Sequence, residues 1–598
     1  MSVPIHIAFF ACLLLVAVES RGAEYFVSPG GADADPGTRE RPLRRIQRAA
    51  DMMQAGDVCT IRAGIYREWI RPPRGGVSED RPITYRAAPG ERVIIRGSER
   101  IISWARDNGT VWRAELPDSF FGDFNPYRLH LSGDWLHYGK EYHLGCVYQD
   151  GVSLREKFTA QEVAAAPGSY RIEENPGSVM LHANFGENDP NREQVEINVR
   201  ECVFFPRLEG LGYVTLDGLW FEHAAANWAA WRCAQRGAVG TGWGFRWVIR
   251  NCRVSDARCV GIVCGNAASS ENSGFDLTNV GGHLVQRNHI LRCGQAAIHG
   301  FKGWGSSVIE GNLIEDINVH EEFGGEETAG IKIHNPIDVT IRNNVLRRIH
   351  ARRVPGDNND FAAIWVDWAG QGTRVTGNVV YDNDPETWAL YLQNNHGSPI
   401  LIDHNVFAGT ISSSSSGCVF AHNLFDRCRW NFLKPYAWVA YWKPHTAEVA
   451  DCKVITCGHD RYLNNVFCGD GIERLPEGPG MQADWNVFYG GAKASGWADP
   501  HSLVLPEIKP QIEFVSRPDG VDLRFDGGDA PQLVKCPLIN RDFIGEFALT
   551  GQGLESPDGT PLALDRDFSG RLRDAVHPAA GPFEGTGPTS VSSRRTGP

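Results

Sequence analysis

Short segments in which apolar and polar residues alternate dominate the middle of the chain. Residues 329–335 (AGIKIHN), 362–368 (AAIWVDW) and 389–394 (ALYLQN) share one pattern of alternation. Successive side chains of a β-strand point to opposite faces, so the isoleucine, valine and leucine positions face one way and the polar and aromatic positions the other. The pattern predicts three stacked strands with an apolar face toward a core and a polar face outward.

Stacking aligns the polar faces of these segments in two columns. One column holds His334, Asp367 and Gln393, and the other holds Lys332, Trp365 and Tyr391. Neighbouring strands lie about 4.8 Å apart, close to the separation of about 5 to 5.5 Å between the two carboxyl groups of a retaining glycosidase. Indole rings suit sugars, whose C–H faces pack on aromatic rings. The columns predict a carbohydrate site around Asp367, with Trp365 and Trp368 as exposed platforms.

An asparagine followed by apolar or β-branched residues recurs at irregular intervals. It stands at Asn288, Asn312, Asn344, Asn378, Asn405, Asn423, Asn465 and Asn486, and successive positions differ by 18 to 42 residues. A helical solenoid keeps a tight period, whereas a parallel β-helix keeps short strands and lets one loop per coil vary. Asparagine tolerates a sharp bend, and stacked asparagine side chains can bond along a column. We therefore expect an all-β chain, a parallel β-helix, with the asparagines as its spine.

Composition divides the chain further. The asparagine motif is missing from residues 82–199, which are rich in aromatic residues and turn signals, and residues 43–53 have the pattern of an amphipathic helix that would cap the β-helix. In chain order we expect a signal peptide (1–23), a cap with the first coils (24–81), an inserted β-sandwich-like domain (82–199), the β-helix (200–545), a C-terminal β segment (546–584) and a disordered tail (585–598).

The apolar run of residues 5–18 has the length of the hydrophobic region of a signal peptide and is short for a membrane span. No other stretch approaches the roughly 18 apolar residues that a spanning helix needs. We expect a secreted or periplasmic protein with no membrane span.

Charge and cysteine spacing narrow the function classes. With 59 Lys and Arg against 72 Asp and Glu, the net charge of −13 disfavours nucleic-acid binding. No CxxC pair occurs, so the spacing of a zinc site is absent; most cysteines fit buried positions, and Cys452 with Cys457 is a candidate disulfide. Residues 357–360 (DNND) offer oxygen ligands for a structural Ca²⁺ but lack the spacing of a dedicated calcium loop. We expect no catalytic metal and no cofactor.

Several longer sequence motifs resemble those of a known family. Residues 95–101 (IRGSERI), 120–127 (FFGDFNPY), 327–334 (ETAGIKIH) and 365–368 (WVDW) resemble the β-xylosidases of glycoside hydrolase family 120, and the similarity runs from about residue 25 to about residue 488. The resemblance implies a right-handed parallel β-helix interrupted by a β-sandwich. It also implies release of xylose from the non-reducing end of short xylo-oligosaccharides, with retention of configuration.

The resemblance also implies roles for single residues. The nucleophile of the family falls on Asp367 and a further active-site glutamate on Glu327, but the acid/base glutamate falls on Gln393. A glutamine can neither donate a proton to the leaving oxygen nor deprotonate water. Glu326 replaces a histidine of the family. The positions that we expect to bind substrate are His334, Lys332, Trp365, Trp368, Tyr391, Gln393, His396 and His223.

Several functions remain open at this point. Glu326 or Glu327 could act as the acid/base; the substrate could carry a good leaving group or its own acid; or the protein could bind glycans without turning them over. A polysaccharide lyase on the same fold is an alternative, with Lys332 as its base and Ca²⁺ to neutralise a uronate. The expected partner is an oligosaccharide or glycoside, and the sequence is compatible with a monomer or a homo-oligomer.

Overall fold

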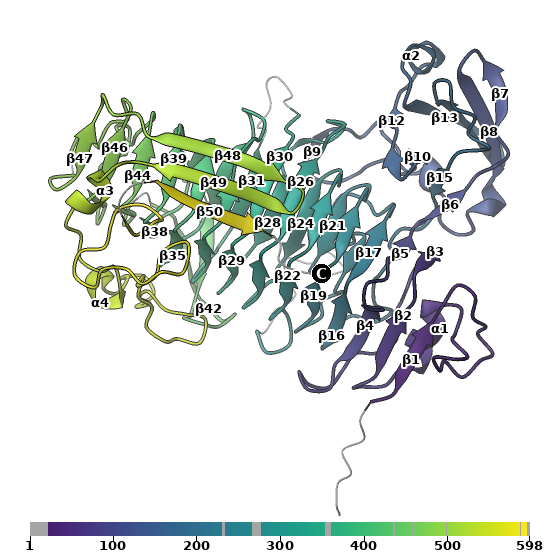
Figure 1. Cartoon of the computed structure of the whole chain (residues 1–598), viewed down its shortest axis with the longest axis horizontal. Helices are drawn as coiled ribbons and strands as arrows, with labels where there is room; N and C mark the ends of the chain where they lie inside the picture. Colours follow the sequence, from purple (N-terminus) through teal and green to yellow (C-terminus); the bar gives the residue numbers. More distant parts are fainter. Residues whose placement is uncertain are drawn as a thin grey trace, which may run out of the picture.

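Three long parallel sheets form a β-helix, as the alternation and the asparagine spacing predicted (Figure 1). The structure is a computed structural model that describes residues 22–229, 234–265, 277–352, 360–434, 437–456, 458–497, 499–585 and 588–594. Residues 1–21 of the expected signal peptide and residues 357–359 of the proposed calcium loop therefore lie outside the described residues.

The first sheet has 13 strands, which are, in spatial order, β1 (Glu24–Val27), β2 (Val58–Ile61), β4 (Ile83–Ala87), β16 (Val214–Asp217), β19 (Val248–Arg250), β22 (Leu284–Gln286), β25 (Val308–Glu310), β29 (Thr340–Arg342), β32 (Arg374–Thr376), β35 (Ile400–Asp403), β38 (Cys418–Ala421), β43 (Arg461–Leu463) and β45 (Gln482–Asp484). The second sheet also has 13 strands, β3 (Gly64–Tyr66), β5 (Val93–Arg96), β17 (Leu219–Glu222), β20 (Arg253–Ser255), β23 (His289–Leu291), β26 (Leu313–Ile317), β30 (Val345–Ile349), β33 (Val379–Val380), β36 (Val406–Ala408), β39 (Leu424–Asp426), β44 (Val466–Cys468), β46 (Val487–Tyr489) and β47 (Leu503–Leu505). The third sheet, which carries the candidate site, has 8 strands, β18 (Val239–Gly240), β21 (Val260–Val263), β24 (Ala296–Phe301), β28 (Thr328–His334), β31 (Phe361–Asp367), β34 (Trp388–Gln393), β37 (Thr410–Ser413) and β40 (Trp430–Phe432).

The asparagine column is the spine of the β-helix. Asn378 shows the arrangement: its side-chain amide donates to Ile341 O at 2.9 Å and to Asn405 Oδ1 at 2.9 Å, and its own Oδ1 accepts from the backbone N–H and the side-chain amide of Asn344. The same contacts repeat from Asn288 to Asn486, and all eight side chains are buried. The column pairs backbone groups that the bends would otherwise leave without partners.

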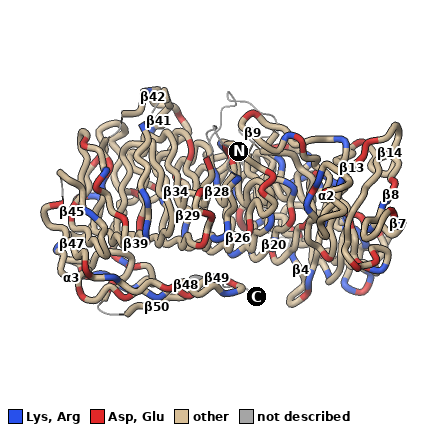
Figure 2. The backbone as a smooth tube through the Cα atoms, turned by 90° about the horizontal axis from the view of Figure 1, so that it is seen from above, with Lys and Arg blue, Asp and Glu red and all other residues tan. Residues whose placement is uncertain are grey.

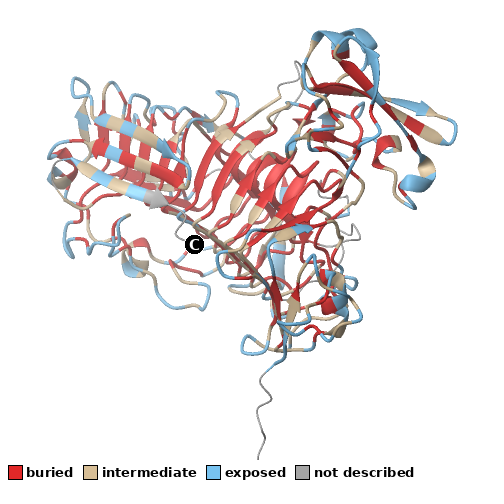
Figure 3. Cartoon of the chain, turned by 45° about the vertical axis from the view of Figure 1, so that its right-hand side comes forward, coloured by how far each residue is buried: buried red, intermediate tan, exposed pale blue. Residues whose placement is uncertain are grey.

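Apolar side chains from all three sheets fill the interior, so the strands appear buried along the whole β-helix (Figure 3). At the N-terminal end α1 (Ile46–Met52) packs Ile46, Ala49 and Ala50 onto this core, as expected for a cap. The described cysteines are free, and all of them except Cys452 are buried; Cys457, its candidate partner, lies outside the described residues.

The inserted domain begins later than residue 82, because β4 and β5 belong to the β-helix sheets. It contains a four-stranded sheet, β11 (Val152–Ser153), β10 (Val147–Gln149), β15 (Val195–Asn198) and β6 (Ser98–Arg100), and a five-stranded sheet, β12 (Arg155–Glu156), β13 (Ser169–Asn175), β14 (Ser178–Asn184), β8 (Val111–Pro117) and β7 (Ala105–Asn108). Two short 3₁₀ helices, η1 (Asp118–Phe120) and η2 (Pro126–Arg128), and α2 (Ala160–Ala165) connect these strands. The domain has an apolar core of its own that includes Trp104, Trp112 and Tyr170.

A segment of the insertion returns to the β-helix. In it β9 (Leu136–Tyr138) pairs antiparallel with β27 (Gly324–Gly325), directly before Glu326. Farther along the chain β41 (Trp438–Trp442) and β42 (Val449–Val454) form a hairpin. Seen from above, β9 and this hairpin lie on one long side of the β-helix and β48–β50 on the opposite side (Figure 2).

The C-terminal part covers the outside of the β-helix, which ends at β47 and not near residue 545. A three-stranded antiparallel sheet, β48 (Gln511–Arg517), β49 (Gly520–Asp526) and β50 (Thr589–Arg594), packs on the outer face of the second sheet. The prediction of a disordered tail is therefore wrong for residues 589–594. Residues 546–584 contain isolated bridges and no strand, and α3 (Ala530–Leu533) and α4 (Arg541–Ile544) precede them.

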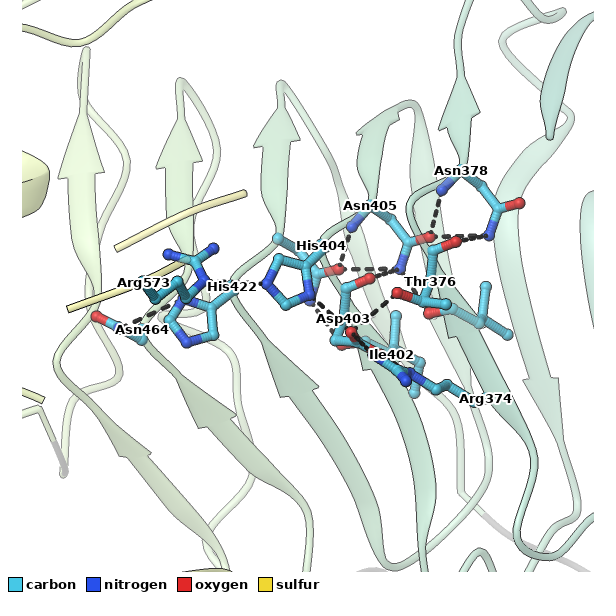
Figure 4. A network of polar contacts seen from close by, with 12 residues as sticks. Arg374, Thr376, Asn378, Ile402, Asp403, His404, Asn405, His422, Asn464 and Arg573 are labelled. Atoms are coloured by element: carbon cyan, nitrogen blue, oxygen red, sulfur yellow. Dashed lines mark hydrogen bonds and ion pairs between the residues drawn. The ribbon is translucent and has the colours of Figure 1, made fainter. Parts of the chain in front are cut away.

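A buried polar network attaches the C-terminal part to the first sheet (Figure 4). Arg573 Nε donates to His404 Nε2 at 3.2 Å, and His404 Nδ1 donates to Asp403 Oδ2 at 2.7 Å. Arg374 binds both oxygens of Asp403, at 2.8 and 2.6 Å. Burial, together with Arg573, lowers the pKa of His404 to about 4, so this ring is neutral and can accept from the guanidinium.

Candidate active site

Three neighbouring strands of the third sheet bring the predicted columns together. The register pairs Lys332 with Trp365 and His334 with Asp367 between β28 and β31. Between β31 and β34 it pairs Trp365 with Tyr391 and Asp367 with Gln393. The predicted alignment is therefore confirmed, and the inward residues Ile331, Ile333, Ile364, Val366, Leu390 and Leu392 all lie in the core.

The outer face of these strands is more enclosed than expected. Trp365 is fully buried and Tyr391 is 2% exposed; their rings contact each other, with centroids 4.9 Å apart. The prediction that Trp365 is an exposed sugar platform is wrong, because its neighbours on adjacent strands cover both sides of the indole. Trp368, by contrast, is 36% exposed and remains available for stacking on a sugar.

A buried ammonium group links the two principal carboxylates. Lys332 Nζ lies 2.9 Å from Glu327 Oε1 and 3.0 Å from Asp367 Oδ2. The same ammonium lies 3.1 Å from the centre of the Trp365 ring, a cation–π contact. Burial disfavours its charge, but attraction to Asp367 and Glu327 outweighs this and raises the pKa of Lys332. Lys332 is therefore a fixed cation and not a base.

Histidines complete the charge network. His334 Nε2 lies 3.1 Å from Asp367 Oδ2 and 3.1 Å from Glu327 Oε2, and His299 Nε2 lies 2.9 Å from Glu327 Oε2. Lys332 and His334 both contact the same oxygen of Asp367, Oδ2. Its Oδ1 is buried and has no hydrogen-bond partner among the described residues, so one lone-pair-bearing oxygen is left for a reacting atom.

Glu327 is held as an anion in a strained position. Burial would raise its pKa, but Lys332, His334 and His299 outweigh burial and hold the pKa of Glu327 well below its usual range. Its backbone has a φ of 77°, in the left-handed region that favours glycine. Such a residue persists because its surroundings fix it. Glu327 orients the cations of the site and is a poor proton donor near neutral pH.

Glu326 differs from Glu327 in its exposure to solvent and in the direction of its pKa shift. Its side chain is partly exposed, and its backbone N–H donates to Trp135 O of the inserted domain at 3.1 Å. Burial raises the pKa of Glu326 to about 7, although Lys332 opposes the shift. A carboxyl group with this pKa can give up and take back a proton near neutral pH.

Sequence reasoning missed two residues of the site. Asp360, which precedes β31, was assigned only to a calcium loop; burial raises its pKa to about 6, and it is hydrogen-bonded to Tyr391. His299, on β24, is the register partner of Lys332 on the neighbouring strand β28. The rung at residues 296–301 (AAIHGF) shares the alternation of its neighbours, and this signal could have identified His299.

Gln393 and two predicted histidines have other partners. Gln393 Oε1 accepts a hydrogen bond from Trp365 Nε1 at 3.1 Å. His396 Nε2 contacts Val439 O of the hairpin at 3.0 Å. His223 is fully buried, stacks on Tyr148 and contacts Ser98 Oγ at 2.8 Å. The structure therefore places His223 at the junction with the inserted domain, where its contacts are with Ser98, Tyr148 and Gly151 and not with the network around Asp367.

A divalent metal does not fit the centre of this network. Ligand atoms of His299, Glu327 and His334 lie within 4.8 Å of one another, which is close enough to surround an ion. The ammonium of Lys332 already lies between Glu327 and Asp367 as their shared cation. A second cation beside it would meet strong repulsion in a buried site.

Comparison with known proteins shows which proteins this chain resembles. The model of the glycoside hydrolase 120 insertion domain matches residues 101–177. The solved complex of XylC with xylose is 30% identical in sequence with a TM-score of 0.86, and the match covers 95% of this chain and all of that one. Fold and similarity together define a glycosidase built on a parallel β-helix. The chain belongs to glycoside hydrolase family 120.

Two further proteins match over a short region only. An uncharacterized protein of Bacillus subtilis, YwoF, is 37% identical over 79 residues, and pectate lyase PEL9 of Emericella nidulans is 39% identical over 79 residues. Each match covers 13% of this chain and less than a fifth of the relative. In the part of the chain that the structure describes, no helix is both long and apolar enough to cross a membrane.

Proposed function

We propose that the protein hydrolyses β-xylosides, such as short xylo-oligosaccharides or a related glycoside, with retention of configuration. Asp367 is the nucleophile and Glu326 the acid/base. The observation that supports this most is the state of Asp367: Oδ2 is bound by Lys332 and His334, and Oδ1 is free to attack the anomeric carbon. XylC, similar over its whole length, was solved with xylose bound.

The position of Gln393 explains why a second carboxyl group must come from elsewhere. Gln393 is the register partner of Asp367 on the adjacent strand, at the spacing that a retaining pair requires. Its amide cannot carry the proton. Among the carboxyl groups near Asp367, Glu327 is held as an anion, whereas Glu326 has a pKa of about 7.

The chemistry then follows in two steps. Asp367 displaces the leaving group while Glu326 donates a proton to the departing oxygen, and a covalent glycosyl ester forms. Glu326, now ionised, deprotonates a water that attacks the same carbon and releases the sugar. Lys332 and His334 hold Asp367 in position throughout.

Comparing two substrates tests this assignment. The leaving group of a nitrophenyl β-xyloside needs little protonation, whereas that of xylobiose needs much. We expect the natural protein to hydrolyse both, and Glu326→Gln to lose about 10²-fold or more on xylobiose with a much smaller loss on the aryl substrate. Asp360→Asn, which removes a carboxyl group beside the site whose pKa is raised to about 6, is the matched control and should stay within a few-fold on both substrates.

The outcomes separate the alternatives. Selective loss in Asp360→Asn instead of Glu326→Gln would assign the acid to Asp360. If neither substrate is hydrolysed although members of a sugar panel bind, the result would support a glycan-binding protein. Unsaturated products from a uronic-acid polymer would support a lyase, although the raised pKa of Lys332 disfavours it as the base.

We also propose that the protein is exported, on the basis of the apolar run at residues 5–18. Cell fractionation with mass determination of the mature N-terminus tests this. An intracellular product that retains residue 1 would contradict it.

A further inference from the structure

Two histidines of the inserted domain form a close pair away from the carbohydrate site. His130 and His143 face each other in an antiparallel bridge. The flanking hydrogen bonds, Leu131 N–H to Tyr142 O at 2.9 Å and Leu144 N–H to Leu129 O at 2.7 Å, make this a non-hydrogen-bonded pair, the kind whose side chains lie closest. The ring centroids are 4.2 Å apart.

The orientation of His143 is fixed by a buried carboxylate. Its Nδ1 donates to Glu156 Oε1, and its backbone N–H donates to Glu156 Oε2 at 3.0 Å. Glu156 is 2% exposed, and Arg258 further holds the segment by donating to His143 O at 2.8 Å. With the proton on Nδ1, the Nε2 lone pair of His143 is available. Histidine ligands of metals are oriented by a carboxylate in this way.

A third ligand lies beside the pair. Glu174 Oε1 is 3.7 Å from His143 Nε2, while Arg128 Nη1 donates to the other oxygen of Glu174 at 3.2 Å. One ligand atom from each of His130, His143 and Glu174 lies within 4.8 Å of the others, and His130 is exposed to solvent. Two imidazole nitrogens and one carboxylate oxygen suit Zn²⁺, whereas Ca²⁺ and Mg²⁺ prefer oxygen alone.

We propose that His130, His143 and Glu174 bind a Zn²⁺ ion on the inserted domain, with a solvent molecule as fourth ligand. The site is independent of the proposed hydrolysis. The two histidines stand at the two ends of residues 130–143, the segment that contains β9 and Trp135. The metal would close the base of this segment, whose tip accepts the backbone N–H of Glu326.

Calorimetric titration of the full chain without a polyhistidine tag, with Zn²⁺ as the only added metal, tests the site. We expect one equivalent to bind and His130→Ala to weaken that binding about tenfold or more. His137→Ala is the matched control, because His137 is an exposed histidine of the same segment that lies outside the ligand set; it should stay within about twofold.

If His130→Ala does not fold, Glu174→Gln provides a second test of the site. Glu174 is partly exposed, so its replacement should leave the fold intact while weakening Zn²⁺ binding by a similar factor. No saturable binding to the natural chain would overturn the proposal. So would equal affinities of the natural chain, His130→Ala and Glu174→Gln, because the metal would then be bound elsewhere.

Discussion

At the residue scale, the site is defined by how two adjacent glutamates divide two tasks. Glu327 is fully enclosed by Lys332, His334 and His299 and stays ionised. Glu326, one position earlier, is less buried, and burial raises the pKa of its carboxyl group to about 7. Electrostatic surroundings, not residue type, therefore separate the positioning carboxylate from the proton carrier.

The first prediction concerns Gln393→Glu. The new carboxyl group would stand one strand from Asp367, and the nearby negative charge would favour its protonated form. We expect hydrolysis of xylobiose to rise about tenfold or more in the Glu326→Gln background. The measurement is kcat/KM on xylobiose for the single and the double variants. If the double variant were no better than Glu326→Gln alone, the position beside Asp367 would be unable to supply the acid.

The pH dependence of kcat/KM gives a second prediction. The acid must be protonated to act, and the pKa of Glu326 is raised from its usual 4.5 to about 7. Activity on xylobiose should therefore be high below about pH 7 and fall as the pH rises through that value. Glu326→Gln should lose this alkaline limb in its residual hydrolysis of xylobiose. Persistence of the limb in the variant would assign it to another group.

At the element scale, the strands and their register follow from local rules. The alternation in residues 329–335, 362–368 and 389–394 fixed which side chains face the core, and the register places Asp367 beside His334 and Gln393 as predicted. Asparagines at the bends marked each coil. Burial of the polar face was not predictable from the alternation, because it depends on how the side chains of Lys332, Trp365 and Tyr391 pack on one another across three strands.

A third prediction tests the asparagine spine. Asn378→Ala removes five hydrogen bonds, including the partner of the buried backbone N–H of Asn344 and a donor to the buried carbonyl of Ile341. We expect the free energy of unfolding to fall by about 3 kcal/mol or more. Urea unfolding measures it, with Arg429→Ala, an exposed position on the same β-helix, expected to change it by less than about 0.5 kcal/mol. Equal stability of the two variants would contradict a structural role for the column.

At the scale of the whole molecule, two parts of the chain meet at the third sheet. The β-helix supplies Asp367, Lys332 and His334, and the inserted domain positions Glu326 through β9 and Trp135. The sequence revealed the insertion by its missing asparagines. The prediction placed the start of the inserted domain too early, because β4 and β5 are β-helix strands that lack the asparagine motif. It also missed β50, whose small polar residues pair with β49 only through tertiary contact.

The central claim is that Asp367 is the nucleophile of a retaining glycosidase, and trapping of the glycosyl-enzyme tests it most directly. A 2-deoxy-2-fluoro-β-xylosyl fluoride needs no acid to lose fluoride, so the missing glutamate at Gln393 does not affect the result. After incubation and proteolysis, mass spectrometry should find the fluorosugar on Asp367, and Asp367→Asn should remain unlabelled. A label on Glu326, Glu327 or Asp360, or no label under conditions in which the aryl xyloside is hydrolysed, would contradict the account.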